Sequence, residues 1–414
     1  MSDPARERRR TGAAREHGSR RTDRLWQAGF LIGTAVGAAV TVAGRHVERS
    51  ARAAGLVDWD QVERLAAGRL RRAPGALTEA ELRATEGAYA DAMARVVPAL
   101  SAHLGAELPG VVDRVSVVDR AAWVRANITG FSSLMSRLET ELIDQILPPG
   151  GGFGKAAMAL ANRWVTTRQL GLLLGFMAQR VLGQYDLALL SAEETPGRLL
   201  FVEENIRATA KALDVPVGPF RTWIALHETT HAYEFEAHPW LRPYLRDRLE
   251  RQMALFSRDA SSLGREALRS LGRALRGDGR GDDQHWMERL MGEEQRQLFR
   301  ETQAVMSLLE GFGDHVMDEV GKSLVPDVER ISARFHGRRS QRTPFERAML
   351  RVTGLDLKME QYRKGEVFVA EIERLGGPAA LRRLWEGPET LPRPDEIARP
   401  AAWVARMDLH GGAA

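Results

Sequence analysis

Apolar residues recur every three or four positions along most of the chain from about residue 57 onward, which is the spacing of helices with one buried face. This pattern predicts helices over residues 59–72, 78–100, 161–183 and 297–320. Strand patterns are sparse, and the best candidate is RLLFVEENI at 198–206, which follows the turn sequence TPG. The sequence therefore predicts a mainly α protein, or an α+β protein with minor strand content.

Two stretches rich in glycine interrupt the helical pattern and predict loops, PPGGGFG at 148–154 and RGDGRGDD at 276–283. The first 24 residues carry eight arginines against four acids, which is typical of a solvated, disordered leader. We therefore predict a basic leader over 1–24, a small-residue apolar helix over 25–47 and one main domain over 48–414.

Residues Leu25 to Gly44 carry no charge and are numerous enough to cross a bilayer. Their four glycines, two threonines and one glutamine make insertion only marginally favourable. We therefore expect this helix to pack on protein and the chain to be cytoplasmic. Membrane contact through residues 25–44 is the alternative.

The charge balance of the remaining chain narrows the classes of partner. Outside the leader, 51 basic side chains face 51 acidic ones, so we expect no nucleic-acid partner. Cysteine is absent, which excludes disulfides, thiolate metal sites and a cysteine nucleophile. Any bound metal must be held by histidine and carboxylate side chains.

The sequence HETTH at 227–231 places two histidines four residues apart, on one face of a predicted helix. His227 and His231 can therefore bind one zinc ion. Glu228 lies one residue further round the helix, where it can act as a general base without being a ligand. This division of roles is typical of metallohydrolases, and a solvated polar helix is the alternative interpretation.

A catalytic zinc ion needs a third protein ligand. His238 is close in sequence but lies one residue out of register with the third histidine of the metzincin pattern. Glu310, in the apolar helix that contains MSLLEG, is the preferred candidate. Asp314, four residues later, is predicted to accept a hydrogen bond from the outer nitrogen of a ligating imidazole. An exposed acidic pair near a helix end is the alternative.

Hydrolysis of an amide also needs a donor that stabilises the oxyanion of the reacting carbonyl. His315 and Tyr362 are the candidates, although each could simply pack or cap within the fold. Asn205, near the end of the predicted strand, could bind a substrate backbone or stabilise a turn.

Several ordered motifs resemble one known family. They are HETTHAYEFEAHPWLRPYL, VLGQYDLALL, RLLFVEENI, SLLEGFGDHVMD, GLDLKMEQYRKGEVFV and the C-terminal EGPETLPRPDEIARPAAWVARM. From Val57 to this last motif the chain is similar to the zincin-like hydrolases, a zinc metallopeptidase family associated with deazaflavin-coenzyme biosynthesis. The resemblance covers nearly the whole chain except the leader.

The resemblance implies a single, mostly helical zincin-like domain in which His227 and His231 are zinc ligands, Glu228 is the base and Glu310 takes the family's LEG position. Together with the spacing of the candidate ligands and base, the resemblance predicts a zinc-dependent hydrolase of a peptide or other amide substrate. Metallopeptidase activity is the leading hypothesis. A zinc-stabilised scaffold that binds a partner without catalysis is the alternative. No pattern in the sequence specifies an oligomeric state.

Overall fold

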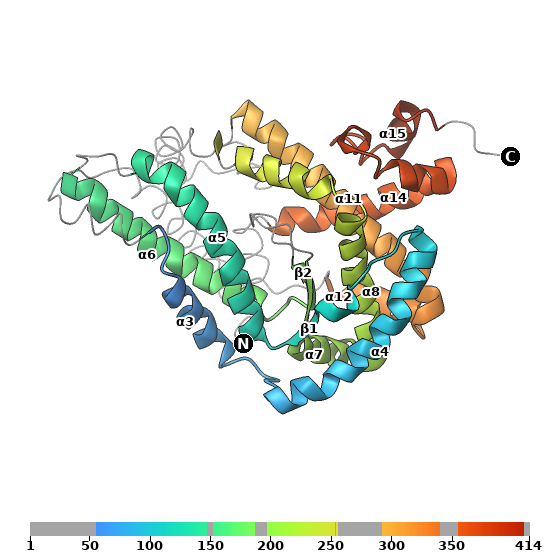
Figure 1. Cartoon of the computed structure of the whole chain (residues 1–414), viewed down its shortest axis with the longest axis horizontal. Helices are drawn as coiled ribbons and strands as arrows, with labels where there is room; N and C mark the ends of the chain where they lie inside the picture. Colours follow the sequence, from blue (N-terminus) through green and yellow to red (C-terminus); the bar gives the residue numbers. More distant parts are fainter. Residues whose placement is uncertain are drawn as a thin grey trace, which may run out of the picture. The chain divides into compact units, whose positions relative to one another are not determined.

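The computed structural model describes residues 55–146, 152–186, 197–252, 254–255, 292–339 and 355–409 (Figure 1). The chain divides into two compact units, each assembled from three sequence segments. The smaller unit comprises Met1–Asp58, Met135–Gln169 and Ala254–Gly292, and the larger comprises Trp59–Leu134, Leu170–Met253 and Glu293–Ala414. The predicted leader, the apolar helix over 25–47 and the loop at 276–283 lie outside the described residues.

Within the described ranges, no helix combines the length and the hydropathy needed to cross a membrane. The segment Leu25–Gly44 is not among these residues, so its contact with a membrane stays a prediction.

Helices dominate the described chain, which confirms the predicted mainly α fold. The larger unit includes the helices α3 (Trp59–Leu70), α4 (Glu79–Leu104), α7 (Glu203–Leu213), α8 (Val217–Glu236), α11 (Glu293–Leu324), α12 (Val328–Arg339), α14 (Leu355–Arg383) and α15 (Pro400–Arg406), and the short 3-10 helices η2 (Val112–Arg114) and η4 (Pro388–Thr390). Helices α5 (Arg120–Ile146) and α6 (Gly152–Met177) each have residues in both units.

A small sheet of three described strands accompanies these helices, in the order β1 (Val115–Val118), β3 (Arg198–Val202), β2 (Gly183–Asp186). Strand β1 runs parallel to β3, and β2 runs antiparallel to it. The predicted strand over 198–206 is wrong at its end, because α7 begins at Glu203. Acidic residues are favoured in the first turn of a helix by the helix dipole, and Glu203 and Glu204 occupy that turn.

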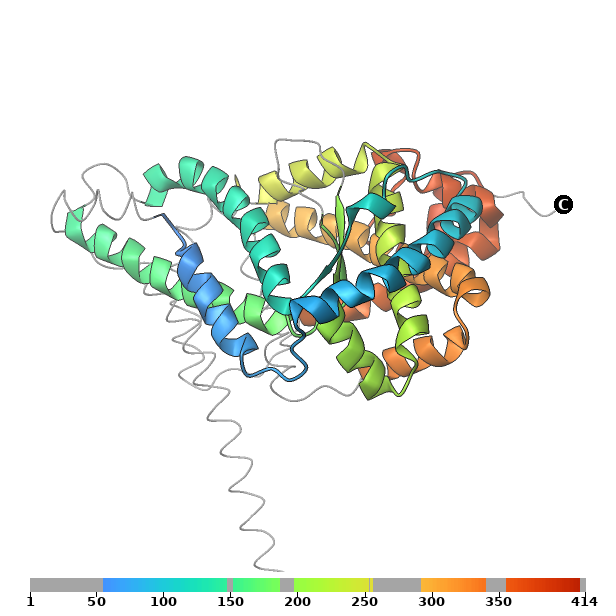
Figure 2. The same cartoon turned by 60° about the horizontal axis from the view of Figure 1, so that its bottom comes forward.

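Helix α8 lies at the centre of the larger unit. It packs against α4 and α11 and contacts both β2 and β3, as Figures 1 and 2 show. Thirteen of its twenty residues are buried, so polar side chains on this helix must find partners inside the protein. Thr229 and Thr230, for example, donate hydrogen bonds to the carbonyl oxygens of Ala225 and Leu226.

The backbones of helices α11 and α14 come close together at two glycines, one on each helix. A Cβ atom at Gly311 would lie 2.1 Å from the carbonyl carbon of Gly365, and one at Gly365 would lie 1.8 Å from the carbonyl oxygen of Ser307. Such contacts leave no room for any side chain at either position. The two glycines therefore set how closely α14 packs against the helix that carries Glu310.

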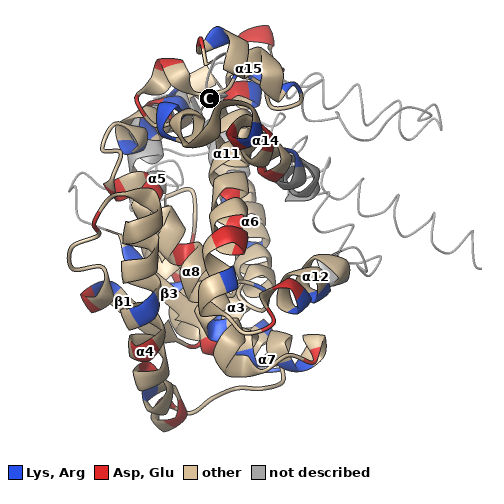
Figure 3. Cartoon of the chain, turned by 90° about the vertical axis from the view of Figure 1, so that its right-hand side faces the viewer, with Lys and Arg blue, Asp and Glu red and all other residues tan. Residues whose placement is uncertain are grey.

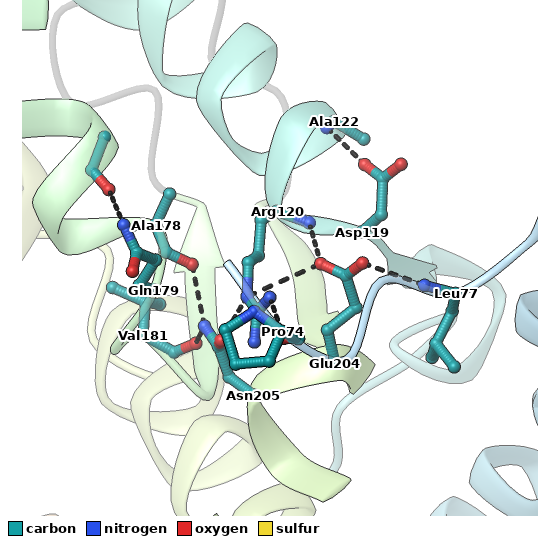
Figure 4. Close-up of polar contacts among 11 residues, drawn as sticks. Pro74, Leu77, Asp119, Arg120, Ala122, Ala178, Gln179, Val181, Glu204 and Asn205 are labelled. Atoms are coloured by element: carbon teal, nitrogen blue, oxygen red, sulfur yellow. Dashed lines mark hydrogen bonds and ion pairs between the residues drawn. The ribbon is translucent and has the colours of Figure 1, made fainter. Parts of the chain in front are cut away.

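A buried polar junction joins segments that are far apart in the sequence (Figure 4). Glu204 accepts hydrogen bonds from the backbone amides of Leu77 and Arg120, each at 3.0 Å. The Arg120 guanidinium donates to the carbonyl oxygen of Pro74 at 2.9 Å. These bonds connect the start of α5, the start of α7 and the chain segment that precedes α4.

Acidic and basic residues occur together on the same helices, including α4, α7 and α12 (Figure 3). This distribution agrees with the equal numbers of the two charges outside the leader. The expected absence of a nucleic-acid partner stays a prediction.

Candidate metal centre

Two histidines of helix α8 face each other one turn apart. The ring centroids of His227 and His231 are separated by 4.7 Å at an interplanar angle of 82°, and their Nε2 atoms lie 3.2 Å apart. The four-residue spacing places both rings on one face of the helix. The exposed fractions of the two side chains are 18% and 15%, so a small ion could reach them from solvent.

Helix α11 brings a carboxylate to this pair. Glu310 Oε2 lies 4.0 Å from His227 Nε2, and one ligand atom from each of Glu310, His227 and His231 lies within 4.8 Å of the other two. A Cβ atom at Gly313 would be 3.4 Å from Cε1 of both rings. The lack of a side chain at Gly313 therefore lets α11 approach the histidines closely.

The outer ring nitrogens of both histidines face carboxylates. His231 Nδ1 donates a hydrogen bond to Glu234 Oε2 at 2.8 Å, and His227 Nδ1 lies 3.6 Å from Asp314 Oδ1. The sequence predicts Asp314 in such a position, whereas Glu234 is not predicted from it. The signal for Glu234 was its place three residues after His231 on the same helix.

Glu228 rests against strand β2. Its Oε2 accepts a hydrogen bond from the backbone amide of Tyr185 at 3.0 Å, and a Cβ atom at Gly183 would lie 2.5 Å from its Cγ. The side chain of Tyr185 is itself fixed, because its hydroxyl donates to Glu236 Oε1 at 2.8 Å. Arg114 binds both carboxylate oxygens of Glu236, at 2.7 and 2.8 Å. Helix α8 is thus joined to β2 at two points.

The carboxylates make the centre attractive to positive charge. Burial by itself lowers the pKa of His231, but the negative charges of Glu234, Glu310 and Glu228 outweigh burial and raise it to about 10. Burial raises the pKa of Glu228 to about 7, and the nearby charge of Glu310 adds to this effect. Burial likewise raises the pKa of Glu234 to about 7.

Of the two predicted oxyanion donors, the described one, His315, is not among the converging side chains. His315 is buried, and its Nε2 lies 3.0 Å from Glu373 Oε2 of α14. Tyr362 belongs to α14, but its side chain lies outside the described part of the structure. The catalytic roles of both residues stay predictions.

The nearby alternative ligand, His238, makes contacts typical of a packed residue. Its Nδ1 donates to the carbonyl oxygen of Glu234 at 2.9 Å, and its ring stacks on Trp385 with a centroid distance of 4.9 Å. Hydrophobic burial lowers the pKa of His238. The structure groups Glu310, and not His238, with the histidines of HETTH.

Asn205 lies in the first turn of α7, where three hydrogen bonds occupy its amide (Figure 4). Its Nδ2 donates to the carbonyl oxygens of Ala178 and Val181, and its Oδ1 accepts from Arg120 Nε at 2.7 Å. These bonds fix the turn that leads from α6 into β2. Of the two roles considered for Asn205, the geometry favours the one in a turn.

The converging side chains fit zinc. Two imidazole nitrogens and one carboxylate oxygen form a ligand set of catalytic zinc sites, which keep a fourth position open. Two nitrogens bound at about 2.0–2.1 Å to a tetrahedral ion lie roughly 3.3 Å apart. The Nε2 atoms of His227 and His231, at 3.2 Å, already have this separation. Carboxylates behind both rings favour the tautomers in which Nε2 faces the ion.

Comparison with known proteins places this geometry in a family. A crystal structure from Chloroflexus aurantiacus, described there as a proposed hydrolase with a novel fold, is similar with a TM-score of 0.63 and 37% sequence identity. The similarity covers 86% of this chain and 100% of the other. No curated protein matches the sequence. The profile of the family described as zincin-like metallopeptidase matches residues 57–404, and the chain therefore belongs to that family.

Proposed function

We propose that the protein is a zinc-dependent hydrolase that cleaves amide bonds, with peptides as the leading substrate class. The observation that carries this proposal is the convergence of His227, His231 and Glu310 beside the buried carboxylate of Glu228. Membership of the zincin-like metallopeptidase family supports a hydrolase that uses a metal, usually zinc. Association with deazaflavin-coenzyme biosynthesis and a cytoplasmic location stay predictions from the sequence.

Each side chain has a defined task in this proposal. His227, His231 and Glu310 would hold the ion, which when bound polarises a substrate carbonyl and lowers the pKa of water. Glu228 removes a proton from the attacking water and passes it to the leaving amine. The amide of Tyr185 holds Oε2 of Glu228, which leaves Oε1 to carry this proton.

The sheet offers support for a peptide substrate. Among the described strands, β2 lies at the edge of the order β1-β3-β2 and pairs only with β3. An extended peptide can add to such an edge through backbone hydrogen bonds. Because β2 also holds Glu228, a peptide bound along it would pass close to the general base.

The test compares metal content and turnover in matched variants. Glu228→Gln should retain zinc at the wild-type stoichiometry and lose at least about 99% of hydrolysis of a quenched fluorescent peptide library. His227→Ala and Glu310→Ala should lose both zinc and hydrolysis. Glu319→Gln is the control, because Glu319 is a surface residue paired with Lys322.

Three outcomes would contradict the proposal. A full equivalent of zinc in the Glu310→Ala variant would exclude Glu310 as a ligand. Hydrolysis that survives the Glu228→Gln change would exclude Glu228 as the base. A zinc-loaded wild-type protein without turnover across peptide and amide libraries would replace the hydrolase by a zinc-stabilised scaffold.

A further inference from the structure

Glu234 is a buried acid with an incomplete set of partners. Its side chain is 0% exposed. Its Oε2 accepts the hydrogen bond from His231 Nδ1, but its Oε1 is buried and has no hydrogen-bond partner among the described residues. A carboxylate in this environment is costly unless positive charge is close by.

Several other acids of the larger unit obtain that charge from arginine. Glu203 is bound by Arg221 and Arg207, and Glu236 is bound by both terminal nitrogens of Arg114. Glu204 and Glu396 are likewise paired with arginine side chains. Glu234 differs from all four, because its described ion pair is with the imidazole of His231.

Among the described residues, the imidazole of His231 is the group placed to bring positive charge to Glu234. One nitrogen of this ring is bonded to Glu234, and the opposite nitrogen faces His227 Nε2 in the metal centre. A cation bound at His231 Nε2 polarises the ring and strengthens the hydrogen bond that Nδ1 donates. Glu234 in turn makes His231 a stronger ligand.

We propose that Glu234 is a positioning residue that orients His231 toward the metal centre and strengthens divalent-cation binding there through its negative charge. This inference rests on the metal site of the proposed function but does not depend on hydrolysis. It extends the centre to a fourth residue of helix α8, after His227, Glu228 and His231.

The experiment uses two glutamates on one helix, two residues apart. In Glu234→Gln the side chain keeps its size and an oxygen that can accept from Nδ1, but it loses its charge. We expect zinc affinity, measured by competition with a chromogenic chelator, to fall about 10- to 100-fold. The melting temperature of the metal-free protein should stay within a few degrees of wild type.

Glu236→Gln is the matched control with the opposite expected pattern. This change breaks a bidentate ion pair with Arg114, so the metal-free protein should melt at a lower temperature. Its zinc affinity should remain within about twofold of wild type, because Glu236 does not contact either imidazole.

Two outcomes would overturn the inference, and a third would separate it from the proposed hydrolase. Wild-type zinc affinity in Glu234→Gln would overturn the inference, whether or not the melting temperature changes. An equal loss of affinity in Glu236→Gln would also overturn it, because the effect would then be a general one on α8. Reduced affinity in Glu234→Gln alone, in a protein that hydrolyses nothing, would support the inference and refute only the proposed hydrolase.

Discussion

At the scale of single residues, the proposed general base, Glu228, is positioned mainly by main-chain atoms. The amide of Tyr185 binds one oxygen of Glu228, and the missing side chain of Gly183 leaves space for the rest of it. Neither Tyr185 nor Gly183 could be identified from a sequence motif, because the role of each depends on the register of β2 against α8. The position of the Glu228 carboxylate is therefore sensitive to substitutions that leave every candidate ligand in place.

Gly183→Ala tests this sensitivity. The new methyl group would lie 2.5 Å from Glu228 Cγ and 2.6 Å from its Oε1, so the carboxylate must move. A displacement of about 1 Å in a catalytic group can reduce turnover by roughly 100-fold. We expect kcat to fall by about that factor while zinc content stays at the wild-type level. Unchanged kcat would show that Glu228 need not occupy this position, and Gly87→Ala, on an open face of α4, is the control.

The buried ion pairs at Glu203 predict how stability depends on pH. Burial by itself raises the pKa of Glu203, but hydrogen bonds from Arg221, Arg207 and Tyr89 outweigh burial and lower it. A carboxyl group whose pKa is lowered by folding stabilises the protein above its unfolded pKa of about 4.3. That stabilisation is lost as the pH falls through the folded pKa.

Glu203→Gln should therefore lower the free energy of unfolding at pH 7 by about 3–5 kcal/mol and make it less dependent on pH below about 5. Urea unfolding at several pH values measures both effects. Glu79→Gln, which removes an exposed pair with Arg83, should cost less than about 1 kcal/mol. If the free energy of unfolding depended on pH in the same way in wild type and Glu203→Gln, Glu203 would not be the source of the pH dependence.

The residues of the candidate centre differ in how far the sequence alone could predict them. His227, Glu228 and His231 follow from one local motif, because helix geometry alone places them together. Glu310 required the additional argument that an acidic residue in an apolar helix needs a partner. Glu234 carried only the weak signal of its helical spacing, since carboxylates on helices are most often solvated.

At the scale of elements, the packing of α11 on α14 depends on two glycines. A Cβ atom at Gly311 would lie 2.1 Å from the carbonyl carbon of Gly365 and 2.4 Å from the amide nitrogen of Glu366, and these backbone atoms cannot move aside independently. Any side chain at Gly311 must push the helices apart. Because Glu310 is the neighbouring residue, the metal centre would be disturbed as well.

Gly311→Ala should lower the free energy of unfolding by more than about 3 kcal/mol and weaken zinc binding. Gly218→Ala is the matched control, since a Cβ atom at Gly218 meets nothing within 4 Å. There the loss of glycine in a helix should stabilise the protein by about 0.4–1 kcal/mol. Chemical denaturation of both variants measures the difference, and equal stabilities would exclude the close contact.

The secondary structure shows why long helices are easier to predict than short strands. The predicted helices at 59–72, 78–100 and 297–320 correspond to α3, α4 and α11, since their apolar spacing extends over several turns. Strands β1 and β2 have four residues each, which is too few for alternation to be distinct. The helix predicted over 161–183 corresponds to α6, which begins earlier, at Gly152 within the predicted loop at 148–154, and ends at Met177. Gly183, the last residue of the predicted helix, begins β2 instead.

At the scale of the whole molecule, the candidate centre joins parts of the larger unit that are distant in sequence. Helix α8 supplies the histidines and the proposed base Glu228, α11 supplies the candidate ligand Glu310, and β2 holds Glu228 in place. A ligand that binds only the folded arrangement stabilises it, by about 2.7 kcal/mol at a concentration 100 times its Kd.

Zinc should therefore raise the melting temperature of the metal-free protein, and a strong chelator should reverse the change. The His227→Ala variant should show little or none of this increase, because it lacks one of the three ligands. Differential scanning fluorimetry across a zinc titration measures both proteins. An equal increase in melting temperature for wild type and His227→Ala would mean that the stabilising zinc is bound elsewhere.

The separation between α8 and α11 also affects the order in which the centre can assemble during synthesis. The two imidazoles come together as soon as α8 forms, whereas Glu310, the candidate third ligand, is translated about eighty residues later. An ion captured early by the pair would gain its last protein ligand only when α11 docks. From then on it would act as a cross-link that closes a long loop and reduces the entropy of the unfolded chain.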